Sequence, residues 1–333
     1  MTGIAVAAAG LLLEIPYPNI DPVAIDLPGP VDLRWYGLGY LLGFLAGYFI
    51  LRRLARRGFL RIDPDAVGDL IFALVVGVLL GGRLGYILFY ELQDYVRDPA
   101  QILRIWEGGL AFHGGLIGVV IAALWFARKH RVDWRNLADG VALGAGPGIF
   151  AVRIANFING ELYGRVASES VPWAMRFPTD PAARELLGMD TVRGMRAREL
   201  ALDRAMQDGT WDWVKQEVPL RHPSQLYEAL GEGVLTALVV WSLYLWNRRR
   251  GVHWGDGAYA GVVVLTYGAV RTVLELFRQP DVQFTSATDP VGTVLGPFTM
   301  GQLLSLGMVV AGLVLAVRGI RAAKHAAEPS PRA

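Results

Sequence analysis

Residues 66–90 read AVGDLIFALVVGVLLGGRLGYILFY, and this stretch decides the class of fold. A helix that crosses a bilayer needs about 20 consecutive, mostly apolar residues, and this stretch meets that requirement. Six further stretches of the same character lie along the chain. The predicted spans cover residues 34–51, 66–90, 109–128, 137–159, 224–246, 256–277 and 298–317. The sequence therefore predicts an all-α polytopic membrane protein with about seven transmembrane helices.

The loops between these spans are of two alternating kinds. One kind is longer and mixed in charge, at about 91–108, 160–223 and 278–297, whereas the other is short and rich in arginine. Loops with an excess of Lys and Arg stay on the cytoplasmic side of a membrane. The basic segments are 52–57, 128–131 and 248–250, together with Arg318, Arg321 and Lys324 of the tail. With seven spans they all fall on one side, which predicts an N-terminus outside and a C-terminus in the cytoplasm.

The spans divide the chain into five predicted regions. Five prolines between positions 16 and 30 break any helix ahead of the first span, and the apolar start lacks the basic segment of a cleaved signal peptide. The segment after the fourth span is rich in Arg, Glu and Asp, which predicts a small head on the membrane surface. The end of the chain, 328–333, is expected to be disordered. The regions are an extracytoplasmic arm (1–33), transmembrane helices 1–4 (34–160), an extracytoplasmic head (161–222), transmembrane helices 5–7 (223–318) and a cytoplasmic tail (319–333).

The composition limits the chemistry that the chain can perform. Of its 333 residues, 19% are charged, whereas soluble proteins carry about 25%. It has no cysteine, which excludes disulfides, thiolate metal sites and a cysteine nucleophile. The five histidines are scattered, without the spacing of a helical metal motif, so we expect no metal and no cofactor. A net charge of +2 gives no sign of a nucleic-acid partner.

Charged groups inside spans are costly and by default mark function, and three polar clusters stand out. The first is the stretch from Trp106 to Gly115, WEGGLAFHGG, at the start of the third span. It places the titratable His113 between paired glycines, which allow the backbone a close approach. We interpret this as a functional imidazole at the membrane boundary. The alternative is a glycine-rich helix-packing face with a hydrogen-bonded histidine.

The second cluster is the stretch from Arg153 to Arg165, RIANFINGELYGR, at the end of the fourth span. Arg153 and Asn156 are three residues apart and share a helix face. The guanidinium lies too deep for an ordinary loop charge, and its planar fork suits a bidentate hold on a lipid phosphate. The alternative is an arginine that snorkels to the interface. The concentration of Arg, Asn and Glu in an apolar stretch favours the phosphate site.

The third cluster combines two segments. The motif HPSQLYE at 222–228 opens the fifth span. In the sixth span, Tyr267, Arg271, Glu275 and Arg278 recur along one helical stripe. A carboxylate between two arginines can orient one guanidinium while the other binds an anion. The alternative for Arg271 and Glu275 is an intramembrane ion pair that serves only assembly.

Two acidic residues, Asp69 in the second span and Asp139 in the fourth, lie near the predicted cytoplasmic ends. A carboxylate near a helix N-terminus is stabilised by the helix dipole. We therefore expect structural roles for both, as dipole partners or packing partners.

Taken together, these segments resemble the bacterial prolipoprotein diacylglyceryl transferase family. The likeness extends over nearly the whole chain, from Arg34–Trp35–Tyr36–Gly37 to Met300–Gly301–Gln302. The family usually has glycine on the N-terminal side of its signature arginine and again two residues after it, where this chain has Val152 and Ala155. That departure touches the local helix packing and not the identity of Arg153. The anchors, in order, are GGRLGY (81–86), FHGG (112–115), NFINGE (156–161), HPSQLYE (222–228) and ELFRQPD (275–281).

The resemblance implies a reaction. Members of the family move the diacylglyceryl group of phosphatidylglycerol onto the thiol of a lipobox cysteine in a prolipoprotein, so that a thioether forms and glycerol phosphate leaves. The implied partners are membrane lipid and a prolipoprotein signal peptide, and the implied location is the bacterial cytoplasmic (inner) membrane. Attack of a thiol on a saturated carbon needs a thiolate and a stabilised phosphate leaving group.

The resemblance also implies roles for residues. His113 is the candidate base for the thiol, or instead a holder of the lipid headgroup. Arg153 and Arg271 are the candidate phosphate clamps, and with His113 they form the expected catalytic set. The residues expected to bind phosphatidylglycerol are Tyr36, Gly114, Arg153, Asn156, Glu161, Tyr267 and Glu275.

Two other classes of protein place polar residues in apolar helices. In a lipid transporter or flippase, the same charges would form a permeation path. Here the strongest cluster sits at the predicted outer ends of spans, and the sequence shows no matched inverted repeat. A non-catalytic membrane scaffold would not explain the density of Arg, Asn, His and Glu in the spans.

Overall fold

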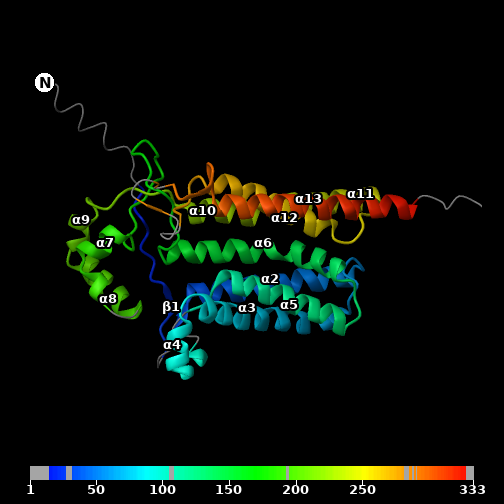
Figure 1. Cartoon of the computed structure of the whole chain (residues 1–333), viewed down its shortest axis with the longest axis horizontal. Coiled ribbons are helices and arrows are strands. Elements are labelled where there is room, and N and C mark those ends of the chain that lie inside the picture. The colour runs from blue at the N-terminus through cyan, green and yellow to red at the C-terminus, as the bar shows by residue number, and fades with distance from the viewer. Residues whose placement is uncertain are drawn as a thin grey trace, which may run out of the picture.

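Long helices run side by side through this protein, and short helices gather at one end of them (Figure 1). A computed structural model describes residues 15–27, 32–104, 109–192, 195–280, 285–286, 289 and 291–327. Several sequence predictions concern residues outside these ranges. They are the parts 1–14 and 28–31 of the N-terminal arm, Trp106–Gly108 of the first cluster, Asp281 of the last anchor and the disordered end at 328–333.

The long helices account for most of the described chain. They are α2 (Trp35–Arg56), α3 (Val67–Phe89), α5 (Phe112–Lys129), α6 (Trp134–Ile158), α11 (Thr236–Arg250), α12 (Ala258–Leu274) and α13 (Met300–Ala327). Basic residues occupy the last turn of several of these helices. In α2 they are Arg53 and Arg56, whose positive charges interact favourably with the negative end of the helix dipole.

Five helical segments of the described chain are long and apolar enough to cross a membrane. They are Trp35–Arg56, Pro64–Phe89, Trp134–Ile158, Ser224–Arg250 and Met300–Ala323. The prediction of an all-α, multi-pass membrane protein is therefore confirmed. The other two predicted spans coincide with the shorter helices α5, of 18 residues, and α12, of 17 residues. The total of seven spans stays a prediction.

Short elements connect the helices. Two antiparallel hairpins pair β1 (Val23–Ile25) with β2 (Leu33–Arg34) and β3 (Thr293–Leu295) with β4 (Phe298–Thr299). The short helices are η1 (Pro64–Ala66), α4 (Leu92–Arg97), η2 (Pro99–Leu103), α7 (Pro181–Leu186), η4 (Met189–Thr191), α8 (Met195–Gln207), α9 (Thr210–Val214) and α10 (Ser224–Glu228). A π-helical turn, η5 (Ala229–Leu235), joins α10 to α11. Helices α7, α8 and α9 belong to the predicted head, whose boundaries stay a prediction (Figure 1).

Glycines let α3 and α5 touch backbone to backbone. A Cβ added at Gly118 of α5 would lie 1.9 Å from the carbonyl oxygen of Gly77, and one at Gly114 would lie 2.2 Å from that of Gly81. Small residues allow such contact between helices in a membrane. Gly114 therefore packs α5 against α3, as the helix-packing alternative predicted. The role of Gly114 in lipid binding stays a prediction.

Asp139 joins two distant helices at the end of the bundle opposite the short helices. Its carboxylate accepts hydrogen bonds from the backbone N–H groups of Gly257, at 2.8 Å, and Ala260, at 2.7 Å. These amides open α12 and have no partner within their own helix. Asp139 thus has the structural role expected from the sequence, although the helix that it caps is not its own.

Backbone pairing at the other end gathers three distant segments. The N–H of Gly164 donates to the carbonyl of His222 at 2.8 Å, and the N–H of Arg165 donates to that of Phe277 at 2.8 Å. A Cβ at Gly164 would lie 2.3 Å from the Phe277 carbonyl oxygen, so only glycine fits this junction. The end of α6, the start of α10 and the end of α12 are thereby held together.

Candidate active site

Two carboxylates with no exposed surface, Glu228 and Glu232, form the centre of a polar network between these helices. They come from α10 and the π-helical turn. Arg153 of α6 contacts both: its Nη1 lies 3.0 Å from Glu228, and its Nη2 lies 3.0 Å and its Nε 3.2 Å from Glu232. Arg271 of α12 also contacts both, at 3.0 Å and 3.1 Å. The two predicted clamps therefore share the same pair of acids.

Further members of the predicted stripe on α12 extend the network. Nη2 of Arg271 lies 3.1 Å from Glu275, and the hydroxyl of Tyr267 donates to Glu232 at 3.1 Å. Arg278 lies 3.5 Å from Glu228. Three arginines therefore face three glutamates, and the buried charges balance. Such balance is required because an unpaired buried charge is very costly.

The π-helical turn brings the glutamates to α6. It contains Gly231 and Gly233, and a Cβ at Gly233 would lie 2.9 Å from the backbone nitrogen of Phe150. This close approach places Arg153, less than one turn beyond Phe150, within reach of both acids. π-Helical turns are rare and frequently occur at functional sites. The hydroxyl of Thr236 donates to the Gly231 carbonyl at 3.1 Å and so satisfies a backbone group of the wide turn.

Glu275 is seated against the start of α13. A Cβ at Gly301 would lie 2.3 Å from a carboxylate oxygen of Glu275. The hydroxyl of Thr299, in the preceding hairpin, lies 3.3 Å from the same oxygen. The glycine of the Met300–Gly301–Gln302 anchor is thus explained by the space that Glu275 occupies.

A second polar group lies next to the network on α6. The side-chain amide of Asn156 donates to Glu161 at 2.8 Å, and that of Asn159 does so at 3.3 Å. Tyr36 of α2 interacts with the side chains of Asn156 and Tyr40. The side chain of Gln225 donates to the Glu161 carbonyl at 2.7 Å. The predicted lipid-binding residues Tyr36, Asn156 and Glu161 therefore lie together.

His113 lies elsewhere, at the exposed start of α5, on the helix pair α3–α5. The loop before it is held by Arg83, a buried residue of α3, which donates to the carbonyls of Gln101 (2.5 Å), Ile102 (3.1 Å) and Gly109 (3.2 Å). The structure thus unites Arg153, Tyr267, Arg271 and Glu275 in one network and places His113 on a different pair of helices. A second histidine, His222, lies at the junction before α10.

His222 has an aromatic environment. Its Nδ1 lies 3.2 Å from the hydroxyl of Tyr227, which accepts a hydrogen bond of 2.6 Å from the indole of Trp173. Burial lowers the pKa of His222 below its ordinary value, so the neutral imidazole is favoured at neutral pH. A neutral imidazole can accept a proton, which makes His222 a second residue to test as a base.

Glu228 and Glu232 had no predicted role. A signal was present, because two acids four residues apart inside an apolar span are costly unless they have partners. The described residues contain no group of three or more His, Cys, Asp or Glu side chains that could hold a metal ion. The network itself consists of guanidinium groups fixed by carboxylates, an arrangement suited to binding an anion such as phosphate.

The fold and the network together define a multi-pass membrane protein with an ion-paired polar site among apolar helices. A family model described as prolipoprotein diacylglyceryl transferase matches residues 22–318, and the chain belongs to this family. It is similar to the phosphatidylglycerol–prolipoprotein diacylglyceryl transferase of Geobacter sulfurreducens, with 42% identity over 302 residues, 90% of this chain and 96% of the relative. Relatives with the same name from Rhodospirillum centenum (42% over 305 residues, 91% and 93%) and Sodalis glossinidius (40% over 299 residues, 90% and 93%) are also similar.

Proposed function

We propose that this chain is an enzyme that transfers the diacylglyceryl group of phosphatidylglycerol to the thiol of the lipobox cysteine of a prolipoprotein. The relatives bear the name of this activity. The observation that carries the proposal is the pair Arg153 and Arg271, partly buried and held by shared, fully buried glutamates among apolar helices. A lipid phosphate is the anion that a bilayer brings to such a site.

The reaction has simple requirements. The sulfur of the peptide forms a bond to the terminal glycerol carbon of the diacylglyceryl group, and the bond from that carbon to the phosphate oxygen breaks. The phosphate oxygen keeps the electron pair, so glycerol phosphate leaves and a thioether remains. The enzyme must take the thiol proton and stabilise charge on the leaving phosphate.

The arginines serve the leaving group. Each guanidinium carries five N–H donors. Among the described residues, Arg153 and Arg271 each donate two hydrogen bonds to glutamates, and each has one further ion-pair contact with a glutamate. Glu228 and Glu232 fix the guanidinium planes. Tyr267 holds Glu232 by a hydrogen bond, and Glu275 holds Arg271 by an ion pair. Donors fixed before the substrate binds need no rearrangement as charge develops, which is the main source of electrostatic catalysis.

The remaining predicted residues bind the lipid headgroup and accept the proton of the peptide thiol. Asn156, Glu161 and Tyr36 form a polar group suited to the glycerol hydroxyls of the headgroup. We assign His113 as the base for the thiol, with headgroup binding as its alternative role. Gly114 keeps α5 close to α3, which sets the position of His113.

The protein belongs in the bacterial cytoplasmic (inner) membrane, with its N-terminus outside and its C-terminus in the cytoplasm. The basic ends of α2, α5 and α11 support this orientation, because Lys and Arg favour the cytoplasmic side. The short helices α7–α9 then lie on the outer surface, at the end of the bundle near α10 (Figure 1).

The direct test uses the purified protein with phosphatidylglycerol and a synthetic lipobox peptide, followed by mass spectrometry. We expect the peptide to gain one diacylglyceryl group, and a peptide with Ser in place of its Cys to gain none. An unmodified Cys peptide, with a folded protein that still binds phosphatidylglycerol, would contradict the proposal and favour a lipid transporter.

A further inference from the structure

Tyr17 of the N-terminal arm reaches the end of α6, although 140 residues separate it from Phe157 in the chain. Its hydroxyl donates to the carbonyl oxygens of Phe157, at 2.8 Å, and Ile158, at 2.7 Å. The last carbonyls of a helix have no partner within it, so this side chain caps α6. Burial, and then the negative charge of Glu161, raises the pKa of Tyr17, and the hydroxyl therefore keeps the proton that it donates.

Aromatic packing holds the ring of Tyr17 in place. Its centroid lies 5.5 Å from that of Phe157 and 5.1 Å from that of Phe177, a fully buried residue of the head. Tyr163 stacks on the same Phe177 at 4.9 Å. Such ring pairs stabilise a structure beyond the area that they bury. Because phenylalanine keeps these ring contacts, the hydroxyl of Tyr17 can be removed without loss of the packing.

The turn that follows α6 carries Glu161 and has an unfavourable backbone. Gly160 and Leu162 both have a positive φ, of 63° and 58°. Residues other than glycine rarely adopt this left-handed region, and strain of this kind persists only where the surroundings hold it. Glu161 lies between these two residues, is exposed, and accepts the bond from the Asn156 amide. The position of its carboxylate therefore depends on the contacts that hold the turn.

Hydrogen bonds from several segments hold this turn. Among the described residues, four side chains donate to the carbonyls of residues 157–162. Three belong to the head and to the start of α10, and the fourth, Tyr17, comes from the arm. The pairs are Thr179 to Gly160, Gln225 to Glu161 (2.7 Å), Ser224 to Leu162 (3.0 Å) and Tyr17 to Phe157 and Ile158.

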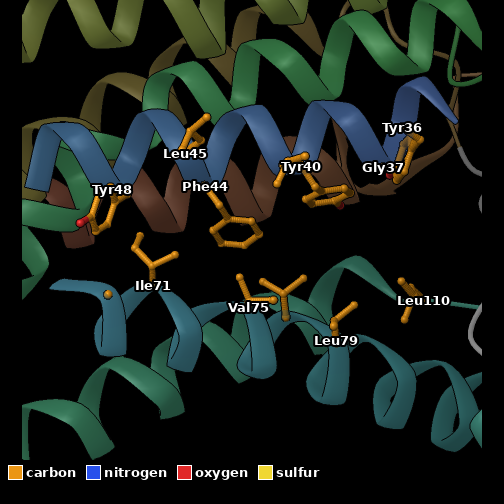
Figure 2. Close-up of a pocket in the computed structure, with 13 residues that line it drawn as sticks. Tyr36, Gly37, Tyr40, Phe44, Leu45, Tyr48, Ile71, Val75, Leu79 and Leu110 are labelled. Atoms are coloured by element: carbon orange, nitrogen blue, oxygen red, sulfur yellow. The ribbon is translucent and has the colours of Figure 1, made fainter. Parts of the chain in front are cut away.

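The same arm is attached to the start of α2, which carries Tyr36. The N–H of Trp35 donates to the carbonyl of Pro22 at 3.1 Å, and β1 of the arm pairs with β2 directly before α2. Tyr36 lies in the first turn of α2, at one end of a pocket lined mostly by α2 and α3 (Figure 2). It interacts with Asn156 of α6. The arm therefore contacts both helices that carry the predicted headgroup residues.

We propose that Tyr17 is a positioning residue, whose hydroxyl holds the turn after α6 so that Glu161 meets the glycerol hydroxyls of the donor headgroup. The inference rests on the proposed function, in which Glu161, Asn156 and Tyr36 bind that headgroup. Tyr17 acts through the backbone of α6, and the described contacts of the arginine network do not include it. Loss of the hydroxyl should therefore weaken lipid binding and spare the chemical step.

The activity test measures kcat and KM for phosphatidylglycerol in mixed micelles, with one lipobox peptide as acceptor. We expect Tyr17→Phe to raise this KM at least about fivefold, the equivalent of one hydrogen bond. Its kcat should stay within about twofold of the parent, because the lost interaction serves binding alone. General damage to the fold would instead lower the active fraction, and with it kcat.

Tyr163→Phe is the matched control. It removes a hydroxyl from the same group of rings, but that hydroxyl donates to the carbonyl of Thr179, at 3.4 Å, and not to the turn. Both kcat and KM of this variant should equal those of the parent.

Hydrogen exchange tests the hold on the turn without catalysis. The N–H groups of Gly160 and Glu161 close the turn with bonds of 3.0 Å to the end of α6, so their exchange reports its opening. In Tyr17→Phe we expect peptides that span 157–163 to exchange at least about fivefold faster than in the parent, because one hydrogen bond that opposes opening is lost. Peptides from α3 should be unchanged.

The outcomes separate the two proposals. If the parent protein modifies no peptide, the proposed function fails, whereas exchange of the turn in Tyr17→Phe equal to that of the parent would overturn the inference independently. With an active parent, an unchanged KM in Tyr17→Phe would overturn it, and so would an equal rise in KM in Tyr163→Phe. A fall in kcat at an unchanged KM would make Tyr17 a residue of general stability, which also contradicts the inference.

Discussion

The side chains of Arg153 and Arg271 are each 14% exposed and contact carboxylates on a different helix. Sequence alone predicted Arg153, Tyr267, Arg271 and Glu275, because charged or polar residues at helical spacing in an apolar stretch are rare. It could not assign their partners. Glu228 and Glu232 lie on another segment, and the pairing of distant segments has no signature in the local pattern.

The first prediction at this scale concerns the shape of the cation. Arg153→Lys keeps the charge, but it loses the planar fork that contacts Glu228 and Glu232 together. We expect kcat to fall at least about tenfold, the equivalent of one lost hydrogen bond to a charged group. Transfer to a lipobox peptide measures the effect.

Arg97→Ala, in the exposed helix α4, is the control and should be close to the parent. Arg271→Ala should be as impaired as Arg153→Lys, because both arginines contact the same acids. Nearly normal turnover of both variants would remove the arginines from the mechanism.

The second prediction concerns the thiol proton. A free cysteine has a pKa of about 8.5, so near pH 7 only a few per cent is thiolate. If His113 is the base, His113→Gln should lower turnover more than lipid binding. Its rate should then recover by about tenfold relative to the parent between pH 7 and pH 9, because solvent supplies the thiolate.

A matched variant tests the other histidine. Burial already lowers the pKa of His222, and that imidazole is neutral at pH 7. Recovery at high pH in His222→Gln, with a parallel profile in His113→Gln, would move the role of the base to His222. Lost lipid affinity in His113→Gln, without recovery, would assign His113 to headgroup binding.

At the scale of elements, the predicted spans coincide with described helices, because runs of apolar residues alone determine where membrane helices form. Two features were not predictable. The fifth span begins as a short α-helix and a π-helical turn, since nothing in a hydropathy pattern marks an extra residue per turn. The hairpin ahead of α13 places β3 in a segment predicted to be a loop and β4 at the first two residues of the predicted last span, 298–317.

The third prediction tests the contact between α12 and α13. In Gly301→Ala the new methyl would lie 2.3 Å from a Glu275 oxygen, so either the helices separate or the carboxylate moves. Since Glu275 pairs with Arg271 at 3.1 Å, we expect a loss of kcat together with a lower thermal midpoint. Overpacking of this kind costs about 1–3 kcal/mol.

Gly307→Ala, less than two turns further along α13, is the control for helix propensity and should not lower the midpoint, because its Cβ meets open space. Equal effects of the two substitutions would contradict the idea that Gly301 is needed to leave space for the Glu275 carboxylate.

At the scale of the whole molecule, the fourth prediction is orientation. In intact cells, Arg57→Cys and Arg250→Cys should resist an impermeant thiol reagent, whereas Asp190→Cys, on the exposed surface of the head, should react. The chain has no cysteine of its own, so each variant reports one position. Permeabilised cells should label all three. Labelling of Arg250→Cys in intact cells would contradict the seven-span topology.

The bond from Asp139 to the start of α12 connects residues 118 positions apart. A ribosome adds about 5–20 residues per second, so roughly 6–24 s pass between the synthesis of the carboxylate and that of its partners. Helix α6 is therefore synthesised before α12, and the first turn of α12 finds its cap on a helix that has already been made. The cap therefore ties the folding of the later half of the protein to the earlier half. A nascent chain that ends before Gly257 lacks the backbone groups that Asp139 binds.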